Sequence, residues 1–151
     1  MPQTTAAING VASIVSIKVA SGSYVDISGS TQSVDAATAT IMNSDTYTLD
    51  GSSAIILLGK VEPVDVTVNV IYTETTSTEA FMIVSAAFAA KSAVQIKWAP
   101  KGSASGANTI ETNATGYITS LDYPAVDATS ADAIMASFTV RCPGITYTDV
   151  A

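Results

Sequence analysis

Histidine is absent from this chain of 151 residues, and cysteine occurs once, as Cys142. Histidine is the commonest general base, proton shuttle and metal ligand, so neither a Ser-His-Asp nor a Cys-His nucleophile can form. A Cys/His zinc site is excluded by the same count. No GxGxxG or GxxxxGK[ST] phosphate loop occurs, and the glycines of 102–106 lack the lysine of such a loop. The sequence therefore predicts a protein that is not an enzyme and carries no cofactor.

Basic residues are scarce. Six Lys and Arg stand against thirteen Asp and Glu, a net charge of −7. A surface of this sign repels phosphate backbones, so we expect no specific DNA or RNA binding, although a duplex can pass such a surface without adhering. Charged residues make up 13% and hydrophobic residues 48% of the chain. Because soluble domains average about 25% charged residues, this composition favours self-association that covers the apolar surface.

Long hydrophobic runs are also missing. The longest nearly apolar run, residues 81–90, is well below the roughly 20 residues that a spanning helix needs, so we expect no membrane partner. No basic residue precedes Lys18, and the start PQTTAAING is polar, which does not fit an export signal. The single cysteine excludes an intramolecular disulfide, and we expect Cys142 to pack as a small hydrophobe.

Alternation of apolar and polar residues dominates what is present. Val64, Val66, Val68, Val70 and Tyr72 alternate with Asp65, Thr67 and Asn69, and residues 134–142 repeat the pattern around Phe138. Both segments are predicted as half-buried strands. Val94, Ile96 and Trp98 also alternate with Gln95 and Lys97, and weaker strands are predicted at 14–19, 38–42, 47–49, 55–58 and 117–123, about eight strands in all. With a hairpin signal at Asp50 and Gly51, the turns favour an antiparallel meander.

One window has helical spacing. In STEAFMIVSAAFAAK, the side chains of Phe81, Val84 and Phe88 fall on one face, which predicts a helix at about 78–91 lying across a sheet. Thr76 and Glu79 have the spacing of a capping box at its start. The predicted fold is therefore mainly β: one antiparallel β-sandwich or barrel over residues 1–151 with a flanking helix. Extended arms are predicted at 1–10 and 144–151.

Three further groups have a functional and a structural interpretation. Asp122, Asp127 and Asp132 could hold calcium, but their spacing matches no known loop and favours solvated acids. Glu62 and Asp65 could act as a glycosidase pair, yet acids beside a strand start are usually surface charge. Trp98 is either a ligand platform or a core side chain, and its alternation with Ile96 favours the core.

The order of these elements resembles that of the tail tube proteins of long-tailed bacteriophages, over residues 24–145. The segments that carry the resemblance are ISG at 27–29, LLGKVEPVDVTVNVIY at 57–72, the helix, VQIKWAPKGSASG at 94–106, and the closing ATGYITSLDYP and DAIMASFTV. The most specific part is W-x-P-x-G, from Trp98 to Gly102. Lys60 after Gly59 departs from the family, in which an aromatic or acidic residue is frequent.

The resemblance implies a structural subunit. Six copies of a β-sandwich with a flanking helix would close into a ring, the rings would stack, and an inner barrel of strands would form a conduit for DNA ejection. Partners would be further copies, a tape-measure protein and a tail terminator, and the protein would be made in the host cytoplasm and located in the virion tail. DNA would pass through the lumen without specific binding.

Two surfaces are predicted on this basis. The candidate lumen face consists of Asp65, Thr67 and Asn69 on one strand and Ser137, Thr139 and Arg141 on another; the sequence leaves open which strand lines the hole. A long loop at about 34–56 is the candidate contact to the adjacent ring, through Asp45, Tyr47, Leu49 and Asp50. The alternatives are a β-sandwich binding module of adhesin or carbohydrate-binding type, and a head-tail joining or decoration protein.

Overall fold

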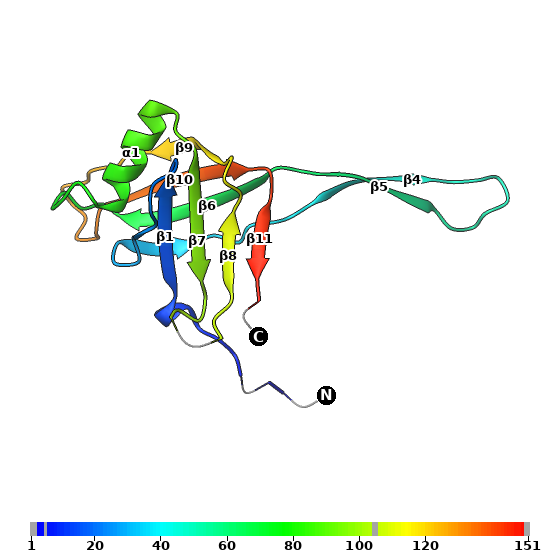
Figure 1. Cartoon of the computed structure of the whole chain (residues 1–151), viewed down its shortest axis with the longest axis horizontal. Coiled ribbons are helices and arrows are strands. Elements are labelled where there is room, and N and C mark those ends of the chain that lie inside the picture. The colour runs from blue at the N-terminus through cyan, green and yellow to red at the C-terminus, as the bar shows by residue number, and fades with distance from the viewer. Residues whose placement is uncertain (1–2, 5, 104–105, 150–151) are drawn as a thin grey trace.

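Two antiparallel sheets form the body of the molecule, and a third, two-stranded sheet projects from it (Figure 1). The computed structural model describes residues 3–4, 6–103 and 106–149. Over these residues the elements are the 3-10 helix η1 (Gly10–Ala12), β1 (Ile14–Val19), β2 (Val25–Asp26), β3 (Thr31–Val34), β4 (Ile41–Thr46), β5 (Ile55–Val61), β6 (Val64–Ile71), α1 (Ala80–Ala90), β7 (Val94–Ala99), β8 (Thr109–Thr112), β9 (Tyr117–Asp122), β10 (Met135–Cys142) and β11 (Ile145–Thr148). No helix in these ranges is long and apolar enough to cross a membrane.

The two body sheets have the orders β11-β8-β7-β1-β2 and β3-β6-β10-β9. In Figure 1 the strands of the five-stranded sheet run vertically and β6 and β10 run horizontally, so the sheets pack crosswise. The predicted antiparallel sandwich with one flanking helix is confirmed. The predicted meander is wrong, because the chain crosses between the two body sheets after β2, after α1, after β8 and after β10, which local turn signals do not reveal.

Period-two alternation builds the core. Every second residue of β6, from Val64 to Val70, is buried, and so is every second residue of β10, from Ala136 to Cys142. Val15, Ile17, Val94 and Ile96 face them from the other sheet. The Cys142 thiol is buried as predicted, and burial raises its pKa. Both strongly predicted strands therefore occur with the predicted faces.

Helix α1 packs against β9 and β1 through Ala80, Phe81, Val84 and Ala87. The prediction that Phe88 also faces inward is wrong: this side chain is 39% exposed. In the last turn the buried side chain is Ala87, the residue before Phe88. The helix ends at Lys91, whose backbone is left-handed (φ 52°) and whose N–H bonds the carbonyl oxygens of Ala87 and Phe88.

The predicted capping box is not formed. Glu79 is the N-cap residue but makes no side-chain cap bond; its carboxylate accepts a hydrogen bond from the Thr73 hydroxyl instead. The hydroxyls of Thr76 and Thr78 bond each other at 2.9 Å. Competing local hydrogen bonds thus replace the cap, and the helix begins at Ala80, two residues later than predicted.

The W-x-P-x-G segment lies at the end of β7 and contacts the chain around η1. Gly102 donates its N–H to Ala99 O at 3.0 Å across a turn with Pro100 at its second position. The Ser13 hydroxyl donates to Pro100 O at 2.9 Å. Gly102 has φ +75°, and a Cβ there would lie 2.2 Å from Ala12 O. A glycine is therefore required here, both by the backbone conformation and by the close approach of η1. Residues 104 and 105 of the following loop lie outside the described residues.

The terminal segments and the predicted loop differ from expectation. Residues 145–148, predicted as part of an extended arm, form β11 and pair with β8. Residues 1–2, 5, 150 and 151 of the predicted arms lie outside the described ranges. The long loop expected at 34–56 is largely a β-hairpin of β4 and β5, while residues 47–49, predicted as a strand, lie in its turn. We call residues 41–61, from Ile41 to Val61, the arm.

Candidate functional site

The outward face of the four-stranded sheet brings the six predicted lumen residues together. Strands β6 and β10 are antiparallel neighbours, and their register pairs Asp65 with Arg141, Thr67 with Thr139, and Asn69 with Ser137. Because the intervening residues of both strands are buried, these six side chains share one solvent-facing surface. Both strands contribute to this surface. We call it the polar face.

Hydrogen bonds order the polar face from end to end. Arg141 Nη1 donates to both carboxylate oxygens of Asp65, at 3.0 and 3.2 Å, and both side chains are half exposed. The hydroxyls of Thr67 and Thr139 lie 2.9 Å apart, within hydrogen-bond distance. An exposed ion pair of this kind contributes only about 0–1 kcal/mol to stability. The network therefore fixes side-chain orientation more than it stabilises the fold.

The neighbouring strands extend the same network with further acids. Asn69 Nδ2 donates to Ser33 Oγ at 2.9 Å and to Asp35 Oδ1 at 3.1 Å. Ser137 Oγ donates to Asp122 Oδ2 at 2.7 Å. The hydrogen-bonded groups thus include the carboxylates of Asp35, Asp65 and Asp122 and one guanidinium, so three negative charges against one positive leave the polar face acidic. Ser33, Asp35 and Asp122 were not predicted as members, because strand pairing across 15 or more residues is not visible in local sequence.

The candidate metal and acid pairs do not come together. Within residues 3–4, 6–103 and 106–149, no cluster of three or more His, Cys, Asp or Glu side chains could hold a metal ion. Asp127 accepts hydrogen bonds from the N–H and hydroxyl of Thr129, which lower its pKa, and Asp65 is paired with Arg141 rather than with Glu62. We therefore interpret these acids as solvated groups or as partners in structural hydrogen bonds and ion pairs.

The outer face of the five-stranded sheet is also polar, and the charged groups around Tyr24 are two lysines and one glutamate. The Tyr24 ring lies between the ammonium groups of Lys97, 4.1 Å from its centroid, and Lys18, at 5.5 Å. The Tyr24 hydroxyl donates to Glu111, and burial together with this carboxylate raises the pKa of the phenol. The aromatic ring is thus engaged within the molecule by two cations. Trp98, predicted as a core residue, is half-buried and packs at the edge of the core.

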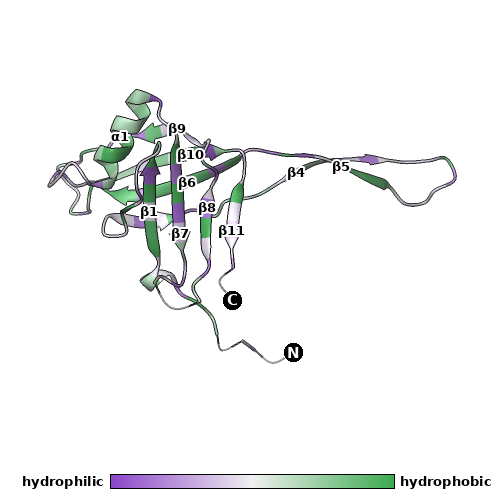
Figure 2. Cartoon of the chain, in the orientation of Figure 1, coloured by the Kyte–Doolittle hydropathy of each residue, from purple (hydrophilic) through white to green (hydrophobic). Residues whose placement is uncertain are grey.

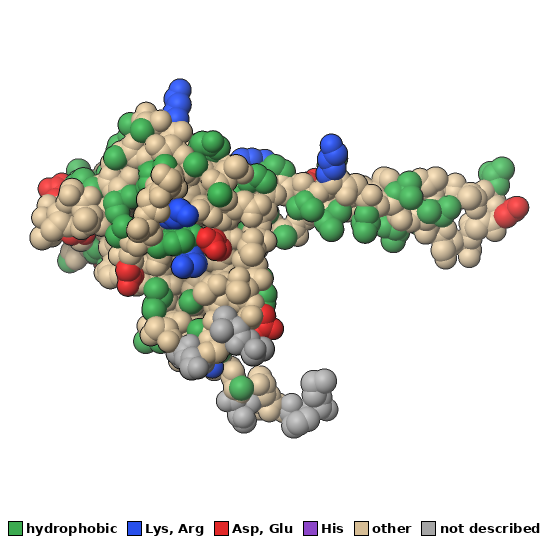
Figure 3. Space-filling view, in the orientation of Figure 1, with side chains coloured by type: hydrophobic (Ala, Val, Ile, Leu, Met, Phe, Trp, Pro, Cys, Tyr) green, Lys and Arg blue, Asp and Glu red, His purple; other side chains and the backbone are tan. Residues whose placement is uncertain are grey.

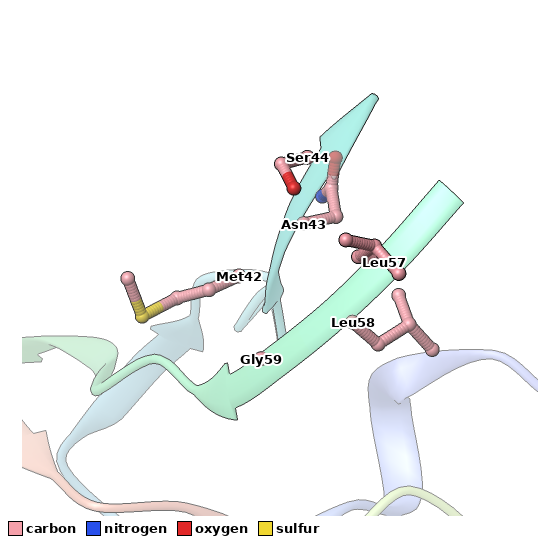
Figure 4. Close-up of a pocket in the computed structure, with 6 residues that line it drawn as sticks. All are labelled: Met42, Asn43, Ser44, Leu57, Leu58 and Gly59. Carbon is pink, nitrogen blue, oxygen red and sulfur yellow. The ribbon is translucent and has the colours of Figure 1, made fainter. Parts of the chain in front are cut away.

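The arm has the opposite chemistry. Every residue of β4 and β5 is exposed, and apolar side chains occur on both faces of β5, from Ile55 to Leu58. Figure 2 shows the arm extending away from the body, with apolar stretches along it, and Figure 3 shows these side chains uncovered. A shallow depression on the arm is lined by Met42, Asn43, Ser44, Leu57, Leu58 and Gly59, all of β4 and β5 (Figure 4). No element of the described body packs over it.

The predicted contact residues lie toward the free end of this arm. Asp45 is on β4, and Tyr47, Leu49 and Asp50 are in the turn that joins β4 to β5. Tyr47 and Leu49 are both exposed, Leu49 completely. The row of apolar residues on β5 was not predicted as part of this contact. Its signal was the run IILL, which does not alternate with polar residues and therefore indicates a strand covered on both faces.

A two-stranded hairpin alone in water is marginally stable, and an exposed apolar hairpin is typical of a surface that another chain covers. The polar face and the arm are therefore the two surfaces of this molecule that are suited to function. One is wet, acidic and internally hydrogen-bonded, and the other is apolar and uncovered.

No protein-family model and no curated protein matches this sequence. The fold, however, is similar to solved structures. A chain of the anti-feeding prophage (AFP) baseplate, 6-fold symmetrised, has a TM-score of 0.75 and 10% identity over 99% of both chains. A chain of the PVC sheath-tube complex, an extracellular contractile injection system in its extended state, has a TM-score of 0.74 and 16% identity over 97% of this chain and 94% of that one.

A chain from the tail of an empty GTA particle, with C6 symmetry, has a TM-score of 0.68 and 14% identity over 96% of this chain and all of the other. At these identities the similarity is one of fold. The chain therefore has a tail-tube-like fold that contractile injection systems and phage-like tails share. The correspondence extends over nearly the whole length of both chains in each comparison.

Proposed function

We propose that this protein is the structural subunit of a tail tube, and that its activity is self-assembly into stacked hexameric rings around a central channel. The observation that carries the proposal is that a tail-tube-like fold has two surfaces of contrasting chemistry, a hydrogen-bonded acidic face and an uncovered apolar arm. Two of the similar structures are described with sixfold or C6 symmetry, which supports a ring of six.

The polar face is proposed to line the channel. The four-stranded sheet ends in β3 on one side and β9 on the other. Within the described chain β3 has no further strand partner, and the outer edge of β9 has only an isolated bridge, from Tyr117 to Ala93. Pairing of β3 in one copy with β9 in the next would close six sheets into one barrel and leave no free edge. The buried faces of β6 and β10 would then point outward into each subunit, and Asp65, Thr67, Asn69, Ser137, Thr139 and Arg141 inward.

The chemistry of this face suits a conduit. Its side chains are hydrogen-bonded to one another, and its net charge is negative. Both properties disfavour adhesion of a like-charged DNA duplex during ejection. The protein would be made in the host cytoplasm and reside in the tail of the particle, with a tape-measure protein inside the tube and a terminator at its end as further partners. No catalytic step is part of this function.

The arm is proposed to contact other copies through its apolar residues, and Asp45, Tyr47, Leu49 and Asp50 to reach the adjacent ring. Apolar side chains are exposed on both faces of β5, so both faces need a partner that covers them. A single binding partner of the subunit would cover only one of the two faces. Repeated copies in a ring and in a stack supply both. The arm therefore favours continuous assembly over a monomeric binding module.

The test is to purify the protein, concentrate it and image it by negative-stain electron microscopy. Hollow tubes or stacked rings are expected. A monomer that persists at high concentration, in both sedimentation and solution scattering, would refute the proposal. Rings that form but never stack would instead indicate a head-tail joining or decoration protein.

A further inference from the structure

A groove of about 510 Å³ lies where the end of α1 meets the start of β9. Phe88 and Tyr117, which are 39% and 48% exposed, are two of the residues that line it, together with the more buried Ile118. The remaining lining consists of Ala87, Ala89, Lys91 and Ser92. The groove is therefore an apolar recess with two aromatic side chains in its walls and with no described part of the chain filling it.

One positively charged side chain, that of Lys91, lies at this groove. Lys91 is part of its lining and is exposed. Its backbone is fixed in the left-handed conformation that ends the helix, so the side chain starts from a defined place. In the described ranges the one salt bridge joins Arg141 and Asp65, so the Lys91 ammonium has no carboxylate within salt-bridge distance. The groove thus combines an apolar surface with an available positive charge.

The free end of the arm has the complementary chemistry. Leu49 and Tyr47 are exposed apolar side chains, and Asp50 follows directly in the sequence. The Asp50 carboxylate, like the Lys91 ammonium, forms no salt bridge in the described ranges. We infer that Tyr47 and Leu49 of one copy insert into the groove beside Phe88 and Tyr117 of another copy, with Asp50 facing Lys91.

The contact must join different molecules. In Figure 1 the arm extends from the body in the direction opposite to α1, so its tip cannot reach the groove of its own chain. The two contacting surfaces differ from each other, which makes the interface head-to-tail. Interfaces of this kind close into rings or continue as filaments rather than ending at a dimer. The inference rests on the proposed self-assembly and adds the surface that receives the arm.

Disulfide cross-linking between two variants tests the inference. Leu49→Cys and Phe88→Cys are prepared separately, both at exposed positions, and Cys142 is buried and stays unreactive. Under mild oxidation we expect a covalent dimer of the two when mixed assemblies form, and no such dimer from either variant alone. Val126→Cys, at an exposed position on a body loop, replaces Phe88→Cys as the matched control and should give no dimer with Leu49→Cys.

Charge reversal gives a second readout that does not depend on the introduced thiols. Asp50→Lys and Lys91→Glu should each raise the critical concentration for assembly about tenfold or more, because like charges would then face each other across the contact. The combination of both in one chain should restore assembly toward the unmodified level. Lys101→Glu, at an exposed lysine away from the groove, is the matched control and should have little effect.

The outcomes separate this inference from the proposed function. If the unmodified protein never assembles, the tube proposal fails and the groove assignment fails with it. If tubes form but the Leu49 and Phe88 variants do not cross-link in mixed assemblies, or if the double charge reversal is as defective as the single changes, the groove assignment alone is overturned. A covalent hexamer from a chain carrying both cysteines would place the contact within a ring, and an open-ended ladder would place it between rings.

Discussion

Replacing Leu58 with serine should weaken assembly without weakening the fold. Leu58 lies on β5 of the arm and is 70% exposed in the isolated subunit. Burying a whole leucine side chain contributes about 1.5–3 kcal/mol, so covering the exposed part on assembly contributes about 1–2 kcal/mol per subunit. Because about 1.4 kcal/mol corresponds to a factor of ten, the critical concentration should rise about 5- to 30-fold.

The same substitution should leave the subunit folded. An exposed side chain that contributes nothing to the core changes the free energy of unfolding by no more than about 0.5 kcal/mol. Critical concentration is measured by pelleting tubes over a dilution series, and unfolding by urea titration of unassembled subunit. The matched control is Val126→Ser, at a position that is 83% exposed on a loop of the body and should change neither quantity.

Two results would contradict this reasoning. Leu58→Ser tubes that assemble at the unmodified concentration would mean that the arm is not covered on assembly. A loss of more than about 1 kcal/mol in unfolding free energy would mean that Leu58 already stabilises the subunit, contrary to its exposure.

Three further predictions follow from the described contacts. Arg141→Met should lower the unfolding free energy by at most about 1 kcal/mol and leave tubes intact, because its ion pair with Asp65 is half exposed; a larger loss in urea titration would show that the pair is structural. Gly102→Ala should lower the unfolding free energy by more than about 1 kcal/mol, measured in the same way, because the backbone has φ +75° there and the alanine Cβ would lie 2.2 Å from Ala12 O. The Asp26 carboxylate accepts hydrogen bonds from Ser28, which lower its pKa below the usual 3.8. The stability that this carboxylate contributes is present above pH 3.8 and is lost as the pH falls through the lowered pKa. Asp26→Asn should therefore reduce the loss of stability on acidification, and an unchanged pH profile of stability would refute this.

The polar face could be predicted from the sequence because strand periodicity decides it locally. When Val64, Val66 and Val68 point into the core, the pleat forces Asp65 and Thr67 to the other side, whatever the rest of the chain does. That β6 and β10 lie side by side could not be predicted, since the two strands are separated by the helix and three other strands. Neither could the added acids, which reach the face only through the pairing of β3 and β9.

The errors have physical causes of the same kind. The capping box failed because Glu79 found a nearer partner in the Thr73 hydroxyl. Helical spacing predicts that Phe88 faces inward, but in the last turn of α1 the buried side chain is Ala87, and Phe88 is 39% exposed. Residues 47–49 are rich in strand-forming side chains, yet they form the turn of a hairpin whose register pairs Thr46 with Ile55. In each case a contact made at long range, or a competing local hydrogen bond, outweighed local propensity.

The distribution of apolar residues predicts that folding and the proposed assembly are separable in this molecule. The body has a continuous core in which the large side chains of both sheets are buried, so it does not depend on the arm for its stability. The arm has no core of its own, because all thirteen residues of its two strands are exposed. In the proposed assembly its apolar side chains would become buried when another copy covers them. A change in the arm should therefore act on the assembly equilibrium, and a change in the body should act on folding. Leu58→Ser in the arm and Gly102→Ala in the body test these two expectations.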